Sequence, residues 1–246
     1  TYSEDKIFDW LSENTLTFDK SFGDHDLNVL GGFSAQKTNY SNTSLAANSF
    51  LTDQISTLNA GIISSGSTFE EQSSLASLFA RVNYSYKNKY MVSLSARGDG
   101  SSKFGVNNQW GYFPSASLGW RVSQEDFFKP LTSTINEFKL RATVGKTGNN
   151  GIPNYAAYGT LTPVNSINNN TIEQGFAQTS TSNPDLSWES TTETNFGIDM
   201  AFLENRLYFS FDYYIAETDQ LLLLVPISAV TGFTEEYQNI GKMKNT

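Results

Sequence analysis

The sequence predicts an all-β fold, an antiparallel transmembrane β-barrel fragment with about nine strands of a larger barrel. Two observations carry this prediction. Apolar residues occupy every second position over long stretches, and short connections alternate with long polar ones between those stretches. A transmembrane barrel strand spans roughly 9–11 residues and collects aromatic side chains at the ends of its apolar face. Soluble β-sandwiches use strands of about five or six residues without such aromatic ends, so a barrel is favoured.

Three consecutive stretches within residues 75–122 show the alternation most regularly. Each is predicted to be one strand, with one apolar face and one face of small polar and charged residues. The apolar face is expected to contact lipid, and its candidate residues are Tyr84, Tyr86, Tyr90, Val92, Leu94, Tyr112, Leu118 and Trp120. The opposite face is expected to line a wet lumen, because barrel strands alternate between lipid and lumen.

Further strands are predicted where the alternation is shorter or less regular. They cover residues 14–20, 27–36, 138–147, 195–202 and 207–215, and a ninth strand begins at Gln238. Gly31 and Gly32 fall inside the second strand of the chain, where glycines favour a bend or bulge.

The connections alternate in length, and this predicts which end of the barrel faces the cell surface. Short turns are expected at residues 22–25, 87–89 and 204–205, the last a two-residue hairpin, and long loops at residues 40–72, 100–110 and 149–192. Outer-membrane barrels have short periplasmic turns and long extracellular loops, so the long loops are expected outside the cell. Residues 124–137 depart from this pattern, because they lie on the short-turn side and are predicted to form one or two helical turns before Pro130.

Composition argues against several classes of protein. The net charge of −9 disfavours nucleic acid as a partner, because phosphate binding needs clustered Lys and Arg. The chain has no Cys and a single His, His25, which is expected to be a solvated turn residue and not a metal ligand. The most apolar run, residues 221–225, is far shorter than the roughly 20 residues of a membrane-spanning helix. Residues 1–20 are polar and acidic, unlike a signal peptide, which suggests an interior piece of a longer protein.

Charged residues on the predicted lumen face are the candidate site residues. They are Arg81, Arg97, Asp99, Arg121, Lys139, Arg141, Asp199 and Asp212. They could line a solute path or only hydrate and bond the lumen, and the structural role is favoured because large barrels have polar lumens by default. Arg97, Gly98 and Asp99 spell an adhesion tripeptide, but Arg97 and Asp99 are at inward-facing positions at the extracellular end of a strand. A charged pair in the lumen is therefore the better interpretation.

No enzyme activity, cofactor or metal is expected. The neighbouring carboxylates at residues 125–126 and 235–236 lie near turns without a partnering base, and no nucleophile motif is present. Aromatic residues in the expected loops could stack on sugar rings or pack against a partner protein, and both alternatives stay open. These residues are Phe50, Phe69, Tyr155, Tyr158 and Phe176.

Several motifs resemble one known family. Residues 83–105 (NYSYKNKYMVSLSARGDGSSKFG) and 110–122 (WGYFPSASLGWRV) closely resemble the SusC/RagA family of TonB-dependent outer-membrane transporters from Bacteroidetes. The same order is kept by residues 140–149 (LRATVGKTGN), 183–189 (NPDLSWE), 194–199 (TNFGID), 231–233 (TGF) and 239–241 (NIG). Together these motifs span most of the chain.

The resemblance implies a location and a function. In that family such motifs belong to the C-terminal half of a barrel of about 22 strands around an N-terminal plug, capped by a SusD-like surface lipoprotein. Residues 1–246 would then be part of one TonB-dependent receptor β-barrel domain, with the plug and the C-terminal strand not included. The implied function is active import of a bulky nutrient, a glycan or a peptide, across the cell outer membrane. The implied partners are the SusD-like lid, outer-membrane lipid and the TonB complex, the last through parts absent from this chain.

Two alternatives to active import remain open at the level of the sequence. One is a passive porin, which would lack a plug. The other is a surface adhesin or lectin that transports nothing. A plug domain upstream of this chain would favour the importer.

Overall fold

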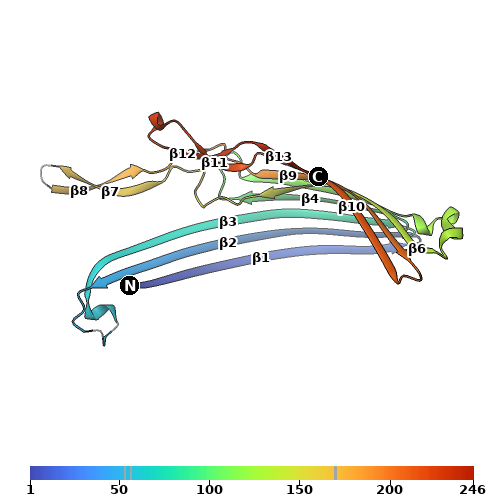
Figure 1. Cartoon of the computed structure of the whole chain (residues 1–246), viewed down its shortest axis with the longest axis horizontal. Coiled ribbons are helices and arrows are strands. Elements are labelled where there is room, and N and C mark those ends of the chain that lie inside the picture. Colours follow the sequence, from blue (N-terminus) through green and yellow to red (C-terminus); the bar gives the residue numbers. More distant parts are fainter. Residues whose placement is uncertain (53, 56, 169–170) are drawn as a thin grey trace.

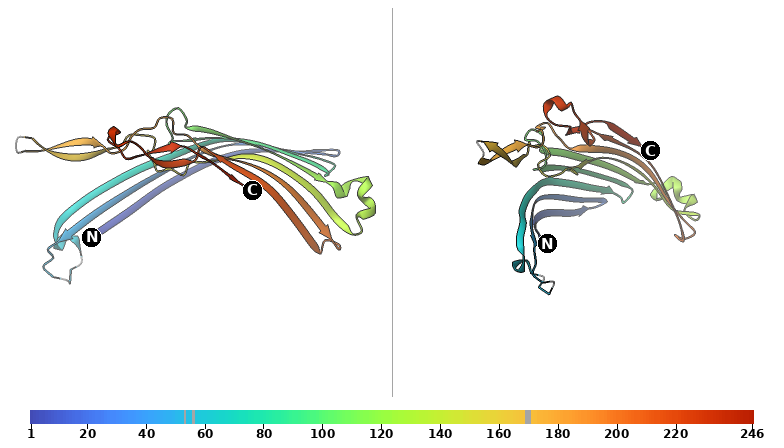
Figure 2. Two further views of the ribbon diagram at one scale, coloured as in Figure 1. Left: turned by 45° about the horizontal axis from the view of Figure 1, so that its top comes forward. Right: turned by 60° about the vertical axis from the view of Figure 1, so that its left-hand side comes forward.

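The computed structural model describes residues 1–52, 54–55, 57–168 and 171–246. One antiparallel sheet dominates the chain, with its strands in the order β1-β2-β3-β4-β5-β6-β9-β10-β13 (Figure 1). Its strands are β1 (Tyr2–Phe22), β2 (His25–Asn48), β3 (Ile62–Tyr86), β4 (Tyr90–Ser101), β5 (Trp110–Arg121), β6 (Ile135–Asn149), β9 (Glu189–Phe202), β10 (Leu207–Asp219) and β13 (Lys242–Asn245). The predicted all-β fold is confirmed. The sheet curves like a section of barrel wall, with β1 and β13 as its open edges (Figure 2).

Two small hairpins and short 3-10 turns lie outside this sheet. The hairpins pair β7 (Leu161–Asn168) with β8 (Thr171–Gln178) and β11 (Leu222–Pro226) with β12 (Glu235–Asn239). The 3-10 turns are η1 (Leu58–Ala60), η2 (Val122–Gln124), η3 (Asp126–Leu131) and η4 (Ala229–Thr231). In the described part of the chain, no helix combines the length and apolarity needed to cross a membrane.

Tight turns join the strands at one end of the sheet, which we call the short-turn end. Gly23 has a φ of 63° and lies in the two-residue connection between Phe22 and His25. Lys87 and Asn88 have φ values of 52° and 54°, as a type I′ turn requires. These turns match the twist of their strands and so fix the register on both sides.

The predicted loop over residues 40–72 is wrong. β2 continues to Asn48 and β3 begins at Ile62, and the two strands pair along this whole extension. β1 likewise begins at Tyr2. Most residues of these extensions are polar on both faces, so the hydrophobic alternation that marks a strand in a membrane is missing there. The wall of β1–β3 therefore runs far beyond the end of β4, at the end opposite the tight turns (Figure 1). We call this the long-loop end.

Three other predicted boundaries are corrected. The long loop 149–192 contains the β7–β8 hairpin, and β9 already begins at Glu189. The two-residue hairpin predicted at 204–205 is a four-residue turn over residues 203–206. The ninth strand of the sheet is β13 and begins at Lys242, whereas Gln238 lies in β12.

The connection predicted to be helical, residues 124–137, forms the 3-10 turns η2 and η3. Pro130 lies inside η3 and does not follow it. Glu125 separates the two turns and binds three neighbours. Its carboxylate accepts hydrogen bonds from the Tyr90 hydroxyl at 2.6 Å, the Trp120 indole at 3.1 Å and the Lys89 ammonium at 3.3 Å. This carboxylate ties the connection to the ends of β4 and β5.

Two further expectations about β2 are wrong. His25 is the first residue of the strand and is partly buried, with Nδ1 2.7 Å from the Tyr84 hydroxyl and its ring stacked on Phe22. Gly31 and Gly32 keep an unbroken register with β3 in place of a bend or bulge. A Cβ atom at Gly32 would collide with the ring of Phe79, which explains the need for glycine.

Candidate functional site

The strand register separates the sheet into an apolar face and a polar face. Residues paired across neighbouring strands lie on the same face. One row of pairs runs Leu27, Tyr84, Val92, Leu118, Ala142 and Phe196, and the next runs Asn28, Asn83, Ser93, Ser117, Thr143 and Asn195. By this register, all eight predicted lipid-facing residues lie on the apolar face and all eight predicted lumen-facing charged residues lie on the polar face.

Aromatic residues mark both ends of the apolar face. At the short-turn end, one row of paired residues is Phe22, His25, Tyr86, Tyr90 and Trp120. At the long-loop end of β5 the same face carries Trp110 and Tyr112, both more than half exposed. The ten residue steps from Trp120 to Trp110 span roughly 34 Å along the strand, or roughly 26 Å across a membrane at the usual strand tilt. This height matches the apolar band of an outer-membrane barrel, about 25 Å.

A chain of side-chain hydrogen bonds crosses the polar face. Asn28 donates to Asp19 at 2.5 Å, Asn83 donates to Asn28 at 3.0 Å, and Ser93 donates to Asn83 at 2.6 Å. Four neighbouring strands, β1 to β4, are joined in this way. Asn28, Asn83 and Ser93 thus satisfy one another's polar atoms and keep this part of the face hydrophilic.

Arg141 organises the charges on the other half of the polar face. Its guanidinium donates to Asp199 at 2.7 and 3.1 Å and to Asp212 at 3.2 Å. Asp199 also accepts a hydrogen bond from Ser210 at 2.8 Å. Gly197 lies below the guanidinium, and a Cβ atom there would be 2.6 Å from its central carbon. The glycine therefore lets Arg141 reach across β9 to β10.

Three of the remaining predicted charges, Arg97, Asp99 and Arg121, have partners of their own. Arg97 pairs with Asp99 at 2.7 Å and also donates to Ser77 at 2.9 Å. Arg121 donates to Glu137 at 3.2 Å. Arg81 is exposed on β3, opposite Ser95 on β4.

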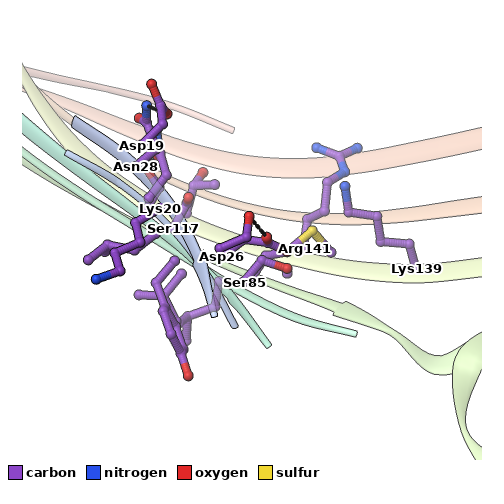
Figure 3. Close-up of a pocket in the computed structure, with 18 residues that line it drawn as sticks. Asp19, Lys20, Asp26, Asn28, Ser85, Ser117, Lys139 and Arg141 are labelled. Carbon is purple, nitrogen blue, oxygen red and sulfur yellow. Dashed lines mark hydrogen bonds between the residues drawn. The ribbon is translucent and has the colours of Figure 1, made fainter. Parts of the chain in front are cut away.

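Lys139 and Arg141 border a hollow of about 440 Å³ on the polar face. In Figure 3 these two cations lie on one side of the hollow, and Asp19 and Asn28 lie on the other. Ser85 and Ser117 also line the hollow. Such a surface can bind water, a polar solute or another polar protein surface.

The prediction from sequence missed the part of this site that lies on β1, β2 and β3. Asp19, Asn28 and Asn83 were not among the candidate residues, although they fall on the predicted inward faces of their strands. A search for every carboxylate, amide and hydroxyl side chain along one face would have found them.

Loops cover the polar face at the long-loop end. Six buried residues, which we call the loop core, pack together there: Phe104, Phe113, Ile152, Ala157, Leu186 and Trp188. The Trp188 ring lies 4.9 Å from that of Phe104, and its indole donates to the Gln109 carbonyl at 2.9 Å. Phe113 belongs to the polar face of β5. The loop core therefore lies over that face at the long-loop end.

The sheet has an apolar band bounded by aromatic residues on one face, hydrogen-bonded polar rows on the other, and tight turns at one end. These features together define a segment of a transmembrane β-barrel. The family model described as "TonB dependent receptor-like, beta-barrel" matches residues 1–246, and the chain belongs to this family.

Several relatives carry the same family name. The chain is 38% identical over 238 residues to "TonB-dependent receptor P3" of Formosa agariphila, covering 96% of this chain and 24% of the relative. It is 40% identical over 246 residues to "TonB-dependent receptor P39" of the same organism, covering 97% and 23%. It is 38% identical over 185 residues to "TonB-dependent receptor SusC" of Bacteroides thetaiotaomicron, covering 72% and 18%. The chain thus spans about a quarter of these relatives or less.

Solved structures agree with this assignment. The RagAB peptide transporter matches with a TM-score of 0.91 and 28% identity, over 98% of this chain and 27% of that one. The resemblance to SusC/RagA transporters is confirmed. The siderophore receptor PirA of Acinetobacter baumannii matches 98% of this chain and 33% of that one, with a TM-score of 0.56 and 17% identity, which shows the shared fold alone.

Proposed function

We propose that this chain is part of the barrel wall of an outer-membrane, TonB-dependent importer of a bulky nutrient, a glycan or a peptide. Residues 1–246 would belong to one β-barrel domain, with the plug and the C-terminal strand outside the chain. The observation that carries the proposal is the two-faced sheet, with its apolar band between aromatic rows. The names of the matching proteins, SusC and the RagAB peptide transporter, support import as the activity.

The faces of the sheet have assigned roles in this proposal. The apolar face, with Leu94 and Leu118, would contact lipid, and the polar face, with Arg141 and Asp199, would line the lumen. Both open edges would pair with further strands, because unpaired backbone groups are not tolerated in lipid. Barrels of this size hold a plugged lumen, so passage of a large solute needs energy from the inner membrane through the TonB complex.

A SusD-like lipoprotein is the proposed lid at the long-loop end. The loop core gives the loops there a fixed shape, and the β7–β8 hairpin projects beyond it (Figure 1). Exposed side chains on the hairpin, such as Ile167, Ile172 and Phe176, offer apolar contact area to a partner protein. The extracellular position of this end rests on the alternation of short and long connections.

The energy requirement tests the proposal. Cells that produce the whole protein would be given labelled oligosaccharides or labelled peptides, with and without a protonophore. An importer of this type loses uptake of its solute when the proton gradient collapses, while surface binding survives. Unchanged uptake would support a passive porin, and binding without uptake in energised cells would support an adhesin or lectin.

A further inference from the structure

A groove lies on the apolar face where β1–β3 rise past the end of β4. β3 pairs with β4 only from Leu75 onward, so the wall beyond this residue has three strands (Figure 1). The row of Trp10, Lys37 and Ser74 lies at the start of this wall. The rows of Phe8, Asn39 and Gln72 and of Lys6, Ser41 and Glu70 follow on the same face. Apart from Trp10 and Phe8, the side chains of these rows are amines, amides, hydroxyls and the carboxylate of Glu70.

Tyr155 forms one side of the groove. Its hydroxyl accepts a hydrogen bond from the Gln72 N–H at 3.0 Å, at the free edge of β3. Its backbone has a φ of 64°, a conformation that a tyrosine adopts at a cost and that the surrounding structure must enforce. Tyr155 and Tyr158 are 38% and 43% exposed. Two aromatic surfaces are therefore held beside the polar rows.

The groove consists of two adjoining hollows of about 520 and 380 Å³, which share Gln72 and Tyr155. Lys6 lines the first and Lys37 the second. Within the described residues, neither amine is in an ion pair, whereas Glu70 and Glu71 border the first hollow. Ammonium groups outside ion pairs can bind phosphate. Tyrosine rings can pack against a sugar ring, and neighbouring amides and hydroxyls can hydrogen-bond its hydroxyl groups.

The position of the groove along the membrane normal indicates its ligand. Trp10 lies in the same row as Lys37, at the long-loop end of the apolar band, where aromatic residues mark the membrane interface. Lys6 lies four residues further along β1, or roughly 10 Å along the membrane normal after the usual tilt. The groove thus opens sideways at the level of the lipid headgroups, and not into the lumen.

From this position and chemistry we propose that the Tyr155 groove binds the phosphorylated sugar headgroup of an outer-leaflet glycolipid. Lys37 and Lys6 contact its phosphates, and Tyr155 and Tyr158 contact the sugar. The site is distinct from the solute path of the lumen. The proposal rests on the outer-membrane location and on lipid contact by the apolar face, as proposed above.

Native mass spectrometry of the whole protein in detergent tests this site. The probes are a diphosphorylated diglucosamine glycolipid and phosphatidylethanolamine. The wild type should retain the glycolipid adduct. In the double variant Lys6→Ala/Lys37→Ala, the affinity for the glycolipid should fall about 30-fold, because each lysine contributes a factor of about five to the affinity for an anionic lipid surface. Lys20→Ala is the matched control, because Lys20 lies on the same face at the short-turn end, and it should leave the adduct unchanged.

A second variant and a second measurement separate the possible failures. Tyr155→Leu should weaken the glycolipid adduct without affecting phosphatidylethanolamine, and the heat-dependent gel mobility of each variant reports whether the barrel is folded. The proposed site is refuted if the folded wild type and the folded double variant bind the glycolipid equally. It is also refuted if the wild type retains the glycolipid and phosphatidylethanolamine equally. Uptake sensitive to a protonophore, measured on the same variants, would still support the importer in that case.

Discussion

Arg141 on β6 donates two hydrogen bonds to Asp199 on β9, 2.7 Å from Nε to Oδ2 and 3.1 Å from Nη2 to Oδ1. The same guanidinium reaches Asp212, so its removal leaves two carboxylates without their cation. Arg141→Met is expected to lower the free energy of unfolding by roughly 1–2 kcal/mol, a modest value because the side chains are about one third exposed. Urea unfolding of the whole protein in lipid vesicles measures this, with Asp212→Asn as a milder comparison. A variant as stable as the wild type would show that the cluster adds nothing.

The two faces of β4 predict different tolerance of a charged side chain at two adjacent positions. Leu94→Arg places a charge at the middle of the proposed lipid face and should cost roughly 2–4 kcal/mol or prevent assembly. Ser93→Arg places the same charge on the polar face and should be far milder, although it removes the hydrogen bond to Asn83. Heat-dependent gel mobility and unfolding in vesicles compare the two. Equal damage from both would refute the facing.

The two ends of the sheet should differ in access from outside the cell. This chain has no cysteine, so single cysteines at Asn107 and Asn88 can be labelled with an impermeant thiol reagent after any others in the whole protein are replaced. Asn107, in the connection between β4 and β5, should react on intact cells. Asn88, in the tight turn after β3, should react only after lysis. Labelling at Asn88 alone would reverse the topology.

The loop core predicts a local loss of structure when it is emptied. Phe104 is fully buried. Phe104→Ala should therefore lower the free energy of local unfolding of the loops by about 3–5 kcal/mol and leave the stability of the strands unchanged. Limited proteolysis of the protein in vesicles should then cut residues 102–109 and 150–188 faster, while the barrel keeps its gel mobility. Val106→Ala is the control, because Val106 is 72% exposed two residues away. Similar rates of cleavage in both variants would contradict the stabilising role of the loop core.

Glu125 gives the short-turn end a dependence on pH. Hydrogen bonds from Tyr90, then Trp120 and then Lys89 hold the pKa of this carboxyl below its ordinary value. Its contribution to stability is therefore complete above the ordinary glutamate range and is lost as the pH falls through the lowered pKa. The thermal unfolding temperature of the wild type should fall more steeply in acid than that of Glu125→Gln. Parallel curves for the two proteins would contradict this role.

The strands that carry the apolar band could be predicted from sequence, and the reason is physical. Leu94 and Ser93 lie on opposite faces of one strand, one apolar and one polar, so the chemistry of neighbouring residues differs and the alternation is visible. The parts of β2 and β3 beyond the end of β4 are mostly polar on both faces, and Tyr40 and Glu71 pair there without any hydrophobic period. The sequence of such a strand therefore looks like a loop.

The candidate site was predictable by face but not by contact. Arg141 and Asp199 could each be assigned to the inward face, yet their pairing depends on β6 and β9 becoming neighbours across an insertion that contains the β7–β8 hairpin. The loop core has the same difficulty, since Phe104 and Trp188 are far apart and carry no periodic pattern. Such contacts follow from the topology of the sheet and not from the local sequence.

The extra height of β1–β3 has a mechanical consequence for whatever sits on the barrel. A rim of even height could receive a cap in many rotational positions, whereas strands that rise on one side block some of them. In the proposed importer, the tall strands would therefore limit the orientations in which a lid can seat. Strand length alone would set this limit, before any specific contact between lid and loop is made.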